Sequence, residues 1–214
     1  SASSLAINRT RDKLRATQIL ARAGVGIPKT VFARETADLE DVISLAGGAP
    51  LIIKMARGTH GRGVVLAETK KAAEAVMQAF YVGGINFLVQ EYIDEADGSD
   101  IRVLIVGGKV IAGVKRQSLD DDFRSNLHQG GEAVSVKLTD DERKTAVKAA
   151  SAMGLPTCGV DMVRSDRGPL VLEVNSSPGL YSVESVSGKN VAGKIIESIE
   201  HSASRRKRKD RVGA

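Results

Sequence analysis

Apolar residues along the chain follow two different periods. In one set of segments they recur every three or four residues, which predicts amphipathic helices over 11–23, 37–46, 69–80, 139–153 and 191–201. Short apolar or alternating runs predict strands at 31–33, 50–54, 64–66, 87–93, 100–106, 109–116, 159–164 and 170–174. Because several neighbouring strands are joined by tight turns, the pattern predicts an α+β fold with antiparallel sheets.

Cap and turn residues set the ends of these elements. Thr139 and Glu142 form a capping box at the start of the clearest helix, and Gly154 ends it. Thr10 is a candidate cap for the first helix. Residues 119–131 are polar and acidic with no periodicity, so they are predicted to form a mobile loop.

The last predicted hairpin brings acidic residues together. If its turn is the three residues 166–168, Asp161 pairs with Glu173 and both side chains lie on one face. Asn175 shares that face, because side chains alternate along a strand. The other face is predicted to pack in the core through Val160, Met162, Leu172 and Val174.

The pairing of Asp161 with Glu173 requires a positive partner. Facing side chains lie about 5 Å apart in a sheet, so two carboxylates there would destabilise it without a cation. Two carboxylates and an amide oxygen are hard ligands suited to Mg²⁺. The hairpin therefore predicts a magnesium site, and the alternative is a solvent-exposed face with incidental acids.

A glycine-rich segment at 58–63 lies between two predicted strands. No Gly-Lys-Ser/Thr follows it, which excludes a Walker loop, and no helix follows it, which excludes a Rossmann turn. Its backbone N–H groups could instead fold over phosphate oxygens as a flap. Lys54 ends the preceding strand, where a phosphate is its natural partner. The alternative is a lysine whose amine reaches water from the strand end.

Residues 89–93 pass from an apolar strand to a polar edge. An apolar slot with backbone hydrogen bonds suits adenine, and Glu91 is placed to hold ribose hydroxyls. Asp100, at the start of the next hairpin, is a candidate for the same region. In the 119–131 loop, Arg124 is a candidate to close over a transferring phosphoryl group. His128 is expected to be a loop hydrogen-bonder rather than a base.

The composition bears on the compartment. The chain has 214 residues, of which 42% are hydrophobic and 27% charged, a mixture typical of globular proteins. No apolar stretch approaches the roughly 20 residues that cross a bilayer, and no signal peptide is recognisable, so we expect a cytoplasmic protein without a membrane partner. Cys158 is the only cysteine, which excludes an internal disulfide, and its apolar surroundings predict an inert thiol.

The positive charge is concentrated at one end. The net charge is +5, and residues 205–211 carry six positive charges and one negative, so the rest of the chain is nearly neutral. Such a run is predicted to be disordered and to favour polyanions such as RNA. The alternative is a solvated tail that aids solubility. With three Tyr, four Phe and no Trp, the chain has no evident set of base-stacking residues.

Taken together, these segments resemble the ATP-grasp ligases. The matching parts, in order, are Lys54, the 58–63 loop, 90–93, Asp161 and 173–179. More narrowly, the chain resembles the RimK family from about residue 9 to residue 201. That likeness is carried by RDKLR at 11–15, GGAPL at 47–51, DFRSNLH at 122–128 and RGPLV at 167–171.

The resemblance implies an ATP-grasp fold, with two α/β lobes whose antiparallel sheets enclose a nucleotide cleft. It implies a disordered start at 1–8, leading helices and a central segment at 9–50, and a small lobe with a glycine-rich flap at 51–93. A large lobe at 94–201 and a disordered basic tail at 202–214 follow. Family members usually begin with a further N-terminal α/β domain, which this chain is expected to lack.

The resemblance also implies site residues. It assigns ATP binding to Lys13, Lys54, Gly58, Gly61, Gly63, Gln90, Glu91, Tyr92, Ile93, Asp100, Arg124, Ser125 and Asn126. It gives Arg124 and Asn126 catalytic roles, and it makes Asp161, Glu173 and Asn175 the ligands of two Mg²⁺ or Mn²⁺ ions.

The implied reaction is the joining of a carboxylate to an amine. ATP phosphorylates the acceptor carboxylate, and the amine of glutamate attacks the acyl phosphate. The resemblance implies the C-terminus of a ribosomal protein as the acceptor and a homo-oligomeric enzyme. Two alternatives are a ligase for a small-molecule or carrier-protein carboxylate and a non-catalytic ATP- or RNA-binding remnant. Phosphoryl transfer depends on charge stabilisation and alignment, which fits the absence of an evident nucleophile.

Overall fold

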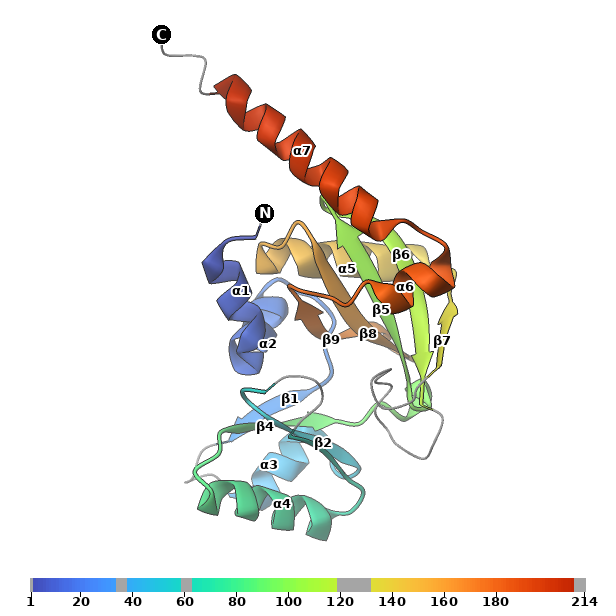
Figure 1. The fold of residues 1–214 in the computed structure, drawn as a ribbon. Coiled ribbons are helices and arrows are strands. Elements are labelled where there is room, and N and C mark those ends of the chain that lie inside the picture. The colour runs from blue at the N-terminus through green and yellow to red at the C-terminus, as the bar shows by residue number, and fades with distance from the viewer. Residues whose placement is uncertain (1, 34–37, 59–62, 119–131, 210–214) are drawn as a thin grey trace.

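The computed structural model describes residues 2–33, 38–58, 63–118 and 132–209, and it places two lobes one above the other (Figure 1). The helices are α1 Ser4–Arg11, α2 Lys13–Arg22, α3 Leu39–Ala46, α4 Lys70–Val82, α5 Asp140–Met153, α6 Tyr181–Ser187 and α7 Val191–Lys209, with the 3₁₀ turn η1 Asp94–Ala96. The strands are β1 Thr30–Ala33, β2 Leu51–Met55, β3 Val64–Ala67, β4 Phe87–Glu91, β5 Ser99–Val106, β6 Lys109–Gln117, β7 Glu132–Ser135, β8 Cys158–Ser165 and β9 Gly168–Asn175. The α+β fold with antiparallel sheets is confirmed.

The small lobe is a four-stranded antiparallel sheet in the order β1-β4-β2-β3. Helices α3 and α4 cover the face turned away from the large lobe (Figure 1). Alternate residues of β2 and β4 fill that side, including the fully buried Leu51, Ile53 and Phe87. The intervening residues, among them Lys54 and Gln90, therefore point to the opposite face.

The large lobe is a five-stranded antiparallel sheet in the order β7-β6-β5-β8-β9. Helices α1, α2 and α5 pack on one face over the main hydrophobic core. The opposite face is covered in part by Val183 of α6 and Val191 of α7. Cys158 is buried in the main core, and burial raises the pKa of its thiol to about 12, as expected for an inert side chain.

Helix α5 is tied to the sheet by its own cap. The predicted capping box is present: Thr139 Oγ1 accepts from the Glu142 backbone N–H, and Glu142 Oε2 accepts from that of Thr139. Glu142 also accepts a 2.6 Å hydrogen bond from Arg164 Nε on β8. One carboxylate thus stabilises the helix end and fixes the helix to the sheet.

The start of the chain is more ordered than predicted. Residues 1–8 were predicted to be disordered, but a helix begins at Ser4. Ser3 caps this helix, α1, and Ala6 is buried in the large-lobe core. The helix predicted over 11–23 is present as α2, but it starts at Lys13 and has a different cap. The helix breaks at Asp12, whose carboxylate caps α2, while Thr10, the predicted cap, lies inside α1.

The end of the chain differs as well. Helix α7 continues to Lys209, past the predicted end of the last helix and into the segment predicted to be a disordered tail (Figure 1). Lysine and arginine are good helix formers, which allows a helix to run into the basic segment. Among the described residues, no helix combines the length and apolar content needed to cross a membrane.

We expect Thr139→Ala to lower the free energy of unfolding by about 1 kcal/mol, because it removes the side chain that caps α5. Urea denaturation monitored by circular dichroism measures this loss. Ser151→Ala, at an exposed position in the same helix, is the matched control and should cost nothing, since alanine is the better helix former. Equal losses in the two variants would contradict the capping role.

Candidate functional site

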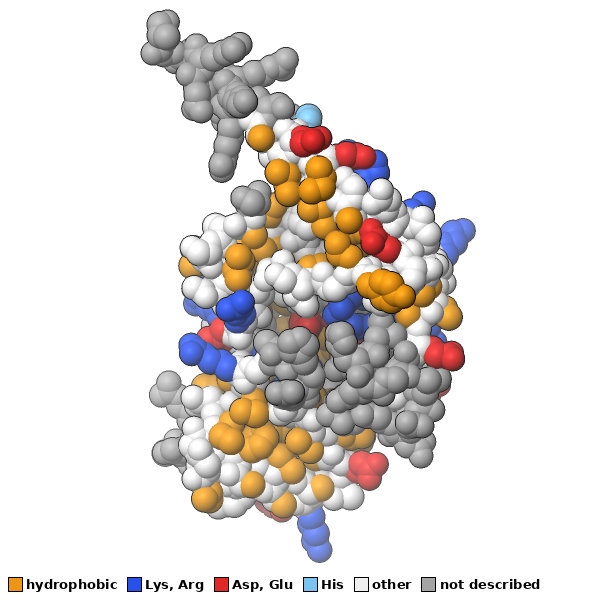
Figure 2. Space-filling model, viewed as in Figure 1, with side chains coloured by type: hydrophobic (Ala, Val, Ile, Leu, Met, Phe, Trp, Pro, Cys, Tyr) orange, Lys and Arg blue, Asp and Glu red, His pale blue; other side chains and the backbone are white. Residues whose placement is uncertain are grey.

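Charged side chains lie in the middle of the large sheet. They are on the same face as α6 and α7, in the part that these two helices do not cover. The register places Arg102 on β5 beside Asp161 on β8, and Asp161 beside Glu173 on β9. On the neighbouring strands Asp100 lies across from Arg116. Figure 2 shows acidic and basic side chains between the two lobes. We call this group, together with Lys13 and Lys54, the interlobe site.

The predicted pairing of Asp161 with Glu173 is confirmed, although the predicted turn is wrong. Ser165 pairs with Gly168, so the turn has two residues rather than three. A bulge between Asp161 and Met162 then shifts the register by one residue and restores the pairing.

The bulge leaves Leu172 without a partner and corrects its predicted place. Leu172 packs with Leu170, Ile93 and Ala96 on the interlobe side. Val171 takes its position in the main core beside Val160, Met162 and Val174, which are buried as predicted.

Asp161 is almost fully enclosed by two arginines. Arg102 donates to both carboxylate oxygens, from Nε to Oδ1 at 2.7 Å and from Nη2 to Oδ2 at 2.6 Å. Arg116 Nη2 lies 3.0 Å from the same Oδ2. Burial would raise the pKa of Asp161, but the charges of Arg116 and Arg102 outweigh it and lower the pKa to about 2. This carboxylate is ionised across the physiological range.

Arg116 joins Asp161 to a second acid. It binds Asp100 through Nε, 2.6 Å from Oδ1, and through Nη2 to Oδ2. All three side chains are buried, with relative exposures of 4–8%. Burial opposes the charge of Arg116, yet the two aspartates raise its pKa overall. Asp100 therefore anchors an arginine, and its role toward nucleotide stays a prediction.

Glu173 differs from Asp161 in that its side chain reaches the surface, although neighbouring groups still restrict its solvation. Loss of solvation raises its pKa, Asp161 raises it further, and Arg102, Lys54 and Lys13 only partly offset the rise. Within the described part of the chain, no group donates a hydrogen bond to its carboxylate. Glu173 thus carries an ionisable group with unused oxygen acceptors.

The donor set fits a hard divalent cation centred on Glu173. Asn175, two residues further on, holds the following turn by accepting from the Ser177 backbone N–H at 2.9 Å. No cluster of three or more Asp, Glu, His or Cys side chains suited to a metal occurs among the described residues. A cation here would need the Asn175 oxygen and ligand oxygens besides the carboxylates, which suits Mg²⁺ better than a metal held by protein alone.

Two lysines lie near Glu173, Lys54 on strand β2 of the small lobe and Lys13 at the start of α2, which packs on the large lobe. Lys54 Nζ donates to Gln90 Oε1 at 2.6 Å, and Lys13 Nζ donates to the Gly58 carbonyl at 2.8 Å. Burial lowers the pKa of both amines, and that of Lys54 falls to about 8, although Glu173 partly offsets the fall. Among the described residues, each ammonium group donates a hydrogen bond only to a neutral acceptor, so a phosphate would be a stronger partner.

The glycine-rich segment is described only at its ends. Gly63 has φ +71°, and a Cβ there would lie 2.1 Å from Met55 Sδ, so only glycine fits without rearrangement. Its carbonyl accepts from the Met55 backbone N–H at 2.8 Å. Gly61 lies outside the described residues, as do the 119–131 loop and its Arg124, Ser125, Asn126 and His128.

The 90–93 segment divides its side chains between two roles. Gln90 points into the interlobe site and holds Lys54, while Ile93 is buried against the large lobe. Glu91 points to the other face, where its Oε1 accepts from the Lys29 backbone N–H at 2.6 Å and from Arg167 Nη2 at 2.5 Å. Its role toward ribose stays a prediction, as does that of the half-buried Tyr92.

Sequence reasoning missed Arg102 and Arg116. Their signal was present, because Asp100 and Arg102 alternate with the apolar Ile101 and Val103 along one strand. Charged residues at alternate positions of a central strand mark a sheet face with its own partners.

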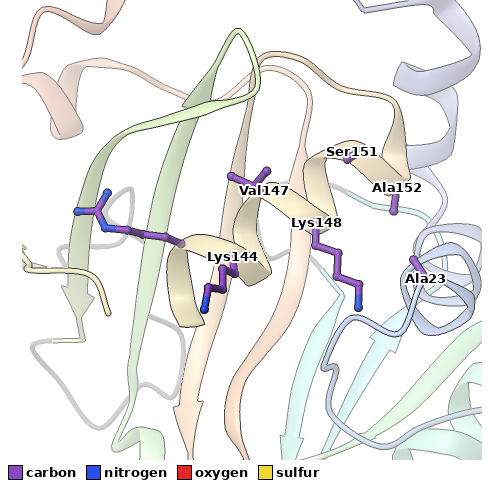
Figure 3. A pocket seen from close by; sticks show the side chains of 7 residues that line it. Ala23, Lys144, Val147, Lys148, Ser151 and Ala152 are labelled. Atoms are coloured by element: carbon purple, nitrogen blue, oxygen red, sulfur yellow. The ribbon is translucent and has the colours of Figure 1, made fainter. Parts of the chain in front are cut away.

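A separate hollow of about 660 Å³ lies on the helical side of the large lobe (Figure 3). It is lined by Ala23, Arg143, Lys144, Val147, Lys148, Ser151 and Ala152. Lys148 already donates to the Gly24 carbonyl at 2.7 Å. None of the residues of the interlobe site line this hollow.

Comparison with known proteins assigns a family to this arrangement. A family model described as RimK-like ATP-grasp domain matches residues 10–199. The chain is 59% identical over 204 residues to a probable alpha-L-glutamate ligase of Aeromonas salmonicida (strain A449), which covers 95% of this chain and 68% of that protein. It is 57% identical over 208 residues to a protein of the same description from Aliivibrio fischeri (strain MJ11), with 97% and 69% covered.

Solved structures share the fold. The ATP-grasp ligase PsnB, complexed with a phosphomimetic variant of its minimal precursor, Mg and ADP, matches with a TM-score of 0.71 at 20% identity. That match covers 94% of this chain and 61% of PsnB. D-alanine–D-alanine ligase from Bacillus anthracis matches with a TM-score of 0.74 at 20% identity, covering 98% and 72%. The predicted ATP-grasp fold is confirmed.

We expect the two facing carboxylates to differ in their effect on stability. Asp161→Asn leaves two buried guanidinium groups short of charge compensation and should cost roughly 3–5 kcal/mol in unfolding free energy. Glu173→Gln should cost little, because the Glu173 side chain is exposed and no described group donates a hydrogen bond to it. Chemical denaturation of both variants tests the contrast. A larger loss for Glu173→Gln would contradict the assigned partners.

We also expect Lys54 to lose its proton near pH 8, so that it is charged below and neutral above that pH. Amine labelling across a pH series, followed by peptide mass spectrometry, measures its pKa. Glu173→Gln removes a charge that raises this pKa and should lower it further. Asp141→Asn, on the exposed side of α5, is the control and should leave the Lys54 profile unchanged.

Proposed function

The chain belongs to the RimK-like ATP-grasp family, and on that premise we propose that it is the catalytic core of an ATP-dependent alpha-L-glutamate ligase. Relatives at 55–59% identity carry that description. The observation that supports the proposal in this chain is the convergence of Lys13, Lys54 and Arg102 on the Asp161–Glu173 pair. Such a site can hold a polyphosphate and its cation together.

In the proposed reaction, one oxygen of the acceptor carboxylate attacks the γ-phosphorus of ATP, and ADP leaves. The nitrogen of glutamate then attacks the carbonyl carbon of the acyl phosphate, and inorganic phosphate leaves as the amide forms. Both steps build negative charge on phosphate oxygens, so fixed cations stabilise them.

The residues of this chain divide that work between the lobes. Lys54 of the small lobe and Lys13 at the start of α2 bind phosphate oxygens, as the desolvation of both amines favours an anionic partner. Arg102 holds the transferring phosphoryl group from the large lobe. The apolar Ile52 and Leu88, on the same face of the small sheet as Lys54, supply a surface for adenine.

The cation ligands we propose are Asp161, Glu173 and Asn175, for two Mg²⁺ or Mn²⁺ ions. When bound, the ions neutralise phosphate charge and align the reacting oxygens. We assign Arg124 and Asn126 to the transferring group, and Gly58, Gly61 and Gly63 to a backbone flap over the phosphates. Exclusion of water by such a flap protects an acyl phosphate from hydrolysis.

We propose the C-terminus of a ribosomal protein as the acceptor and a homo-oligomeric enzyme. The basic run at 205–211 supports an acceptor associated with RNA, because positive charge speeds encounter with a polyanion. Mass spectrometry of products from ATP, glutamate and a mixed acceptor pool tests the assignment. Glutamate on a small acid alone would replace the ribosomal acceptor, and no product from any acceptor would contradict the ligase proposal.

We expect Glu173→Gln to reduce phosphate release with ATP, Mg²⁺, glutamate and acceptor by roughly a hundredfold or more, as for other losses of transition-state charge stabilisation. A coupled phosphate assay measures the rate. Glu74→Gln, on the helix that backs the small sheet, should retain the wild-type rate. Wild-type turnover by Glu173→Gln would rule out its place in the cation site.

A further inference from the structure

The interlobe site carries an excess of positive charge before any ligand binds. Four cationic side chains, Lys13, Lys54, Arg102 and Arg116, face three anionic ones, Asp100, Asp161 and Glu173, which leaves a net charge of +1. The site as described therefore attracts an anion first and opposes a free divalent cation.

The acceptor capacity of Asp161 is mostly used. A carboxylate offers about four lone-pair positions, and the two arginines occupy two on Oδ2 and one on Oδ1. A cation at Asp161 would also lie beside two guanidinium charges, which repel it. In this arrangement Asp161 serves the arginines rather than a metal.

The two arginines are not held equally. Arg116 is fixed between Asp100 and Asp161 and has only 4% of its side chain exposed. Arg102 has 14% exposed, and within the described residues Asp161 is its one hydrogen-bonded acid. The end of its stem lies next to Gly159, where an added Cβ would be 3.8 Å from Arg102 Cδ. Arg102 is thus the partner that can leave Asp161 while Arg116 stays.

We propose that Arg102 guards Asp161. In the ligand-free protein it withholds the carboxylate from divalent cations, and it releases the carboxylate when phosphate oxygens of the nucleotide take over its guanidinium. The anion then binds before the cation, and the cation site is completed only where a nucleotide is present. This inference rests on the proposed function, because it assigns the phosphates and the cation to the same site.

The test uses ligand probes that need no turnover. Binding of Mn²⁺ without nucleotide is measured by electron paramagnetic resonance of the free ion, and binding of inorganic triphosphate without metal by calorimetry. Arg102→Gln should tighten Mn²⁺ binding and weaken triphosphate binding, each by roughly tenfold, because it removes one charge next to both ligands. The two affinities are expected to change in opposite directions. A distorted site would instead bind both ligands more weakly.

Arg164→Gln is the matched control, because Arg164 also pairs with a carboxylate, Glu142, but does so away from the interlobe site. It should leave both affinities unchanged. Arg102→Lys keeps the positive charge but cannot form the bidentate hydrogen bond with Asp161. It should change the Mn²⁺ affinity less than Arg102→Gln does. The wild-type protein supplies a test without any variant: metal-free triphosphate should bind more tightly than nucleotide-free Mn²⁺.

The outcomes separate this inference from the proposed function. Unchanged Mn²⁺ affinity in Arg102→Gln, or wild-type protein that binds Mn²⁺ alone more tightly than triphosphate, would overturn the guarding role while ligation persists. Wild-type protein that binds neither ATP–Mn²⁺ nor triphosphate would instead contradict the nucleotide site itself.

Discussion

The structure depends on one requirement, which is that the buried carboxylate of Asp161 be compensated. An isolated ion in this position would cost several kcal/mol, and a pair recovers that cost only with good geometry and further hydrogen bonds. Arg102 and Arg116 provide both, and Asp100 compensates Arg116 in turn. Apolar clusters on the same face, around Val114 and around Val163, flank the charged group. The large sheet can therefore keep charge in its centre without losing its packing.

This compensation leaves Glu173 and the lysines as the reactive part of the site. Asp161 is already paired with Arg102 and Arg116, and its remaining effect is to raise the pKa of Glu173. Glu173 in turn stabilises the charge on Lys54, which burial opposes. Glu173 of the large lobe and Lys54 of the small lobe thus attract each other. Among the described residues, neither forms a hydrogen bond with a group of opposite charge. A polyphosphate with its cation supplies both signs at once, which is why the two ligands suit the site together better than either does alone.

Local patterns predicted most of the fold and one part of the site. Capping chemistry located α5 correctly, because Thr139 and Glu142 act within one turn. The position of Lys54 at the end of an apolar strand, next to the glycine-rich segment, was enough to single it out as a candidate. The boundaries that failed depend on distant contacts: the break at Asp12 coincides with a bridge to Arg57, and α1 is held by burial of Ala6. Arg102 and Arg116 could not be ranked from sequence, since only the sheet order places them beside Asp161.

The pairing of Asp161 with Glu173 shows how a correct result can follow from a wrong intermediate step. A three-residue turn gives this pairing in a regular hairpin, but the actual turn has two residues. With a regular ladder from that turn, Asp161 would face Leu172, and Glu173 would face Val160 and point into the core. The bulge inserts Leu172 as an unpaired residue and moves Glu173 to the other face. The bulge is therefore part of the site: it brings the second carboxylate to the first, and it places Leu172 in the apolar cluster beside them.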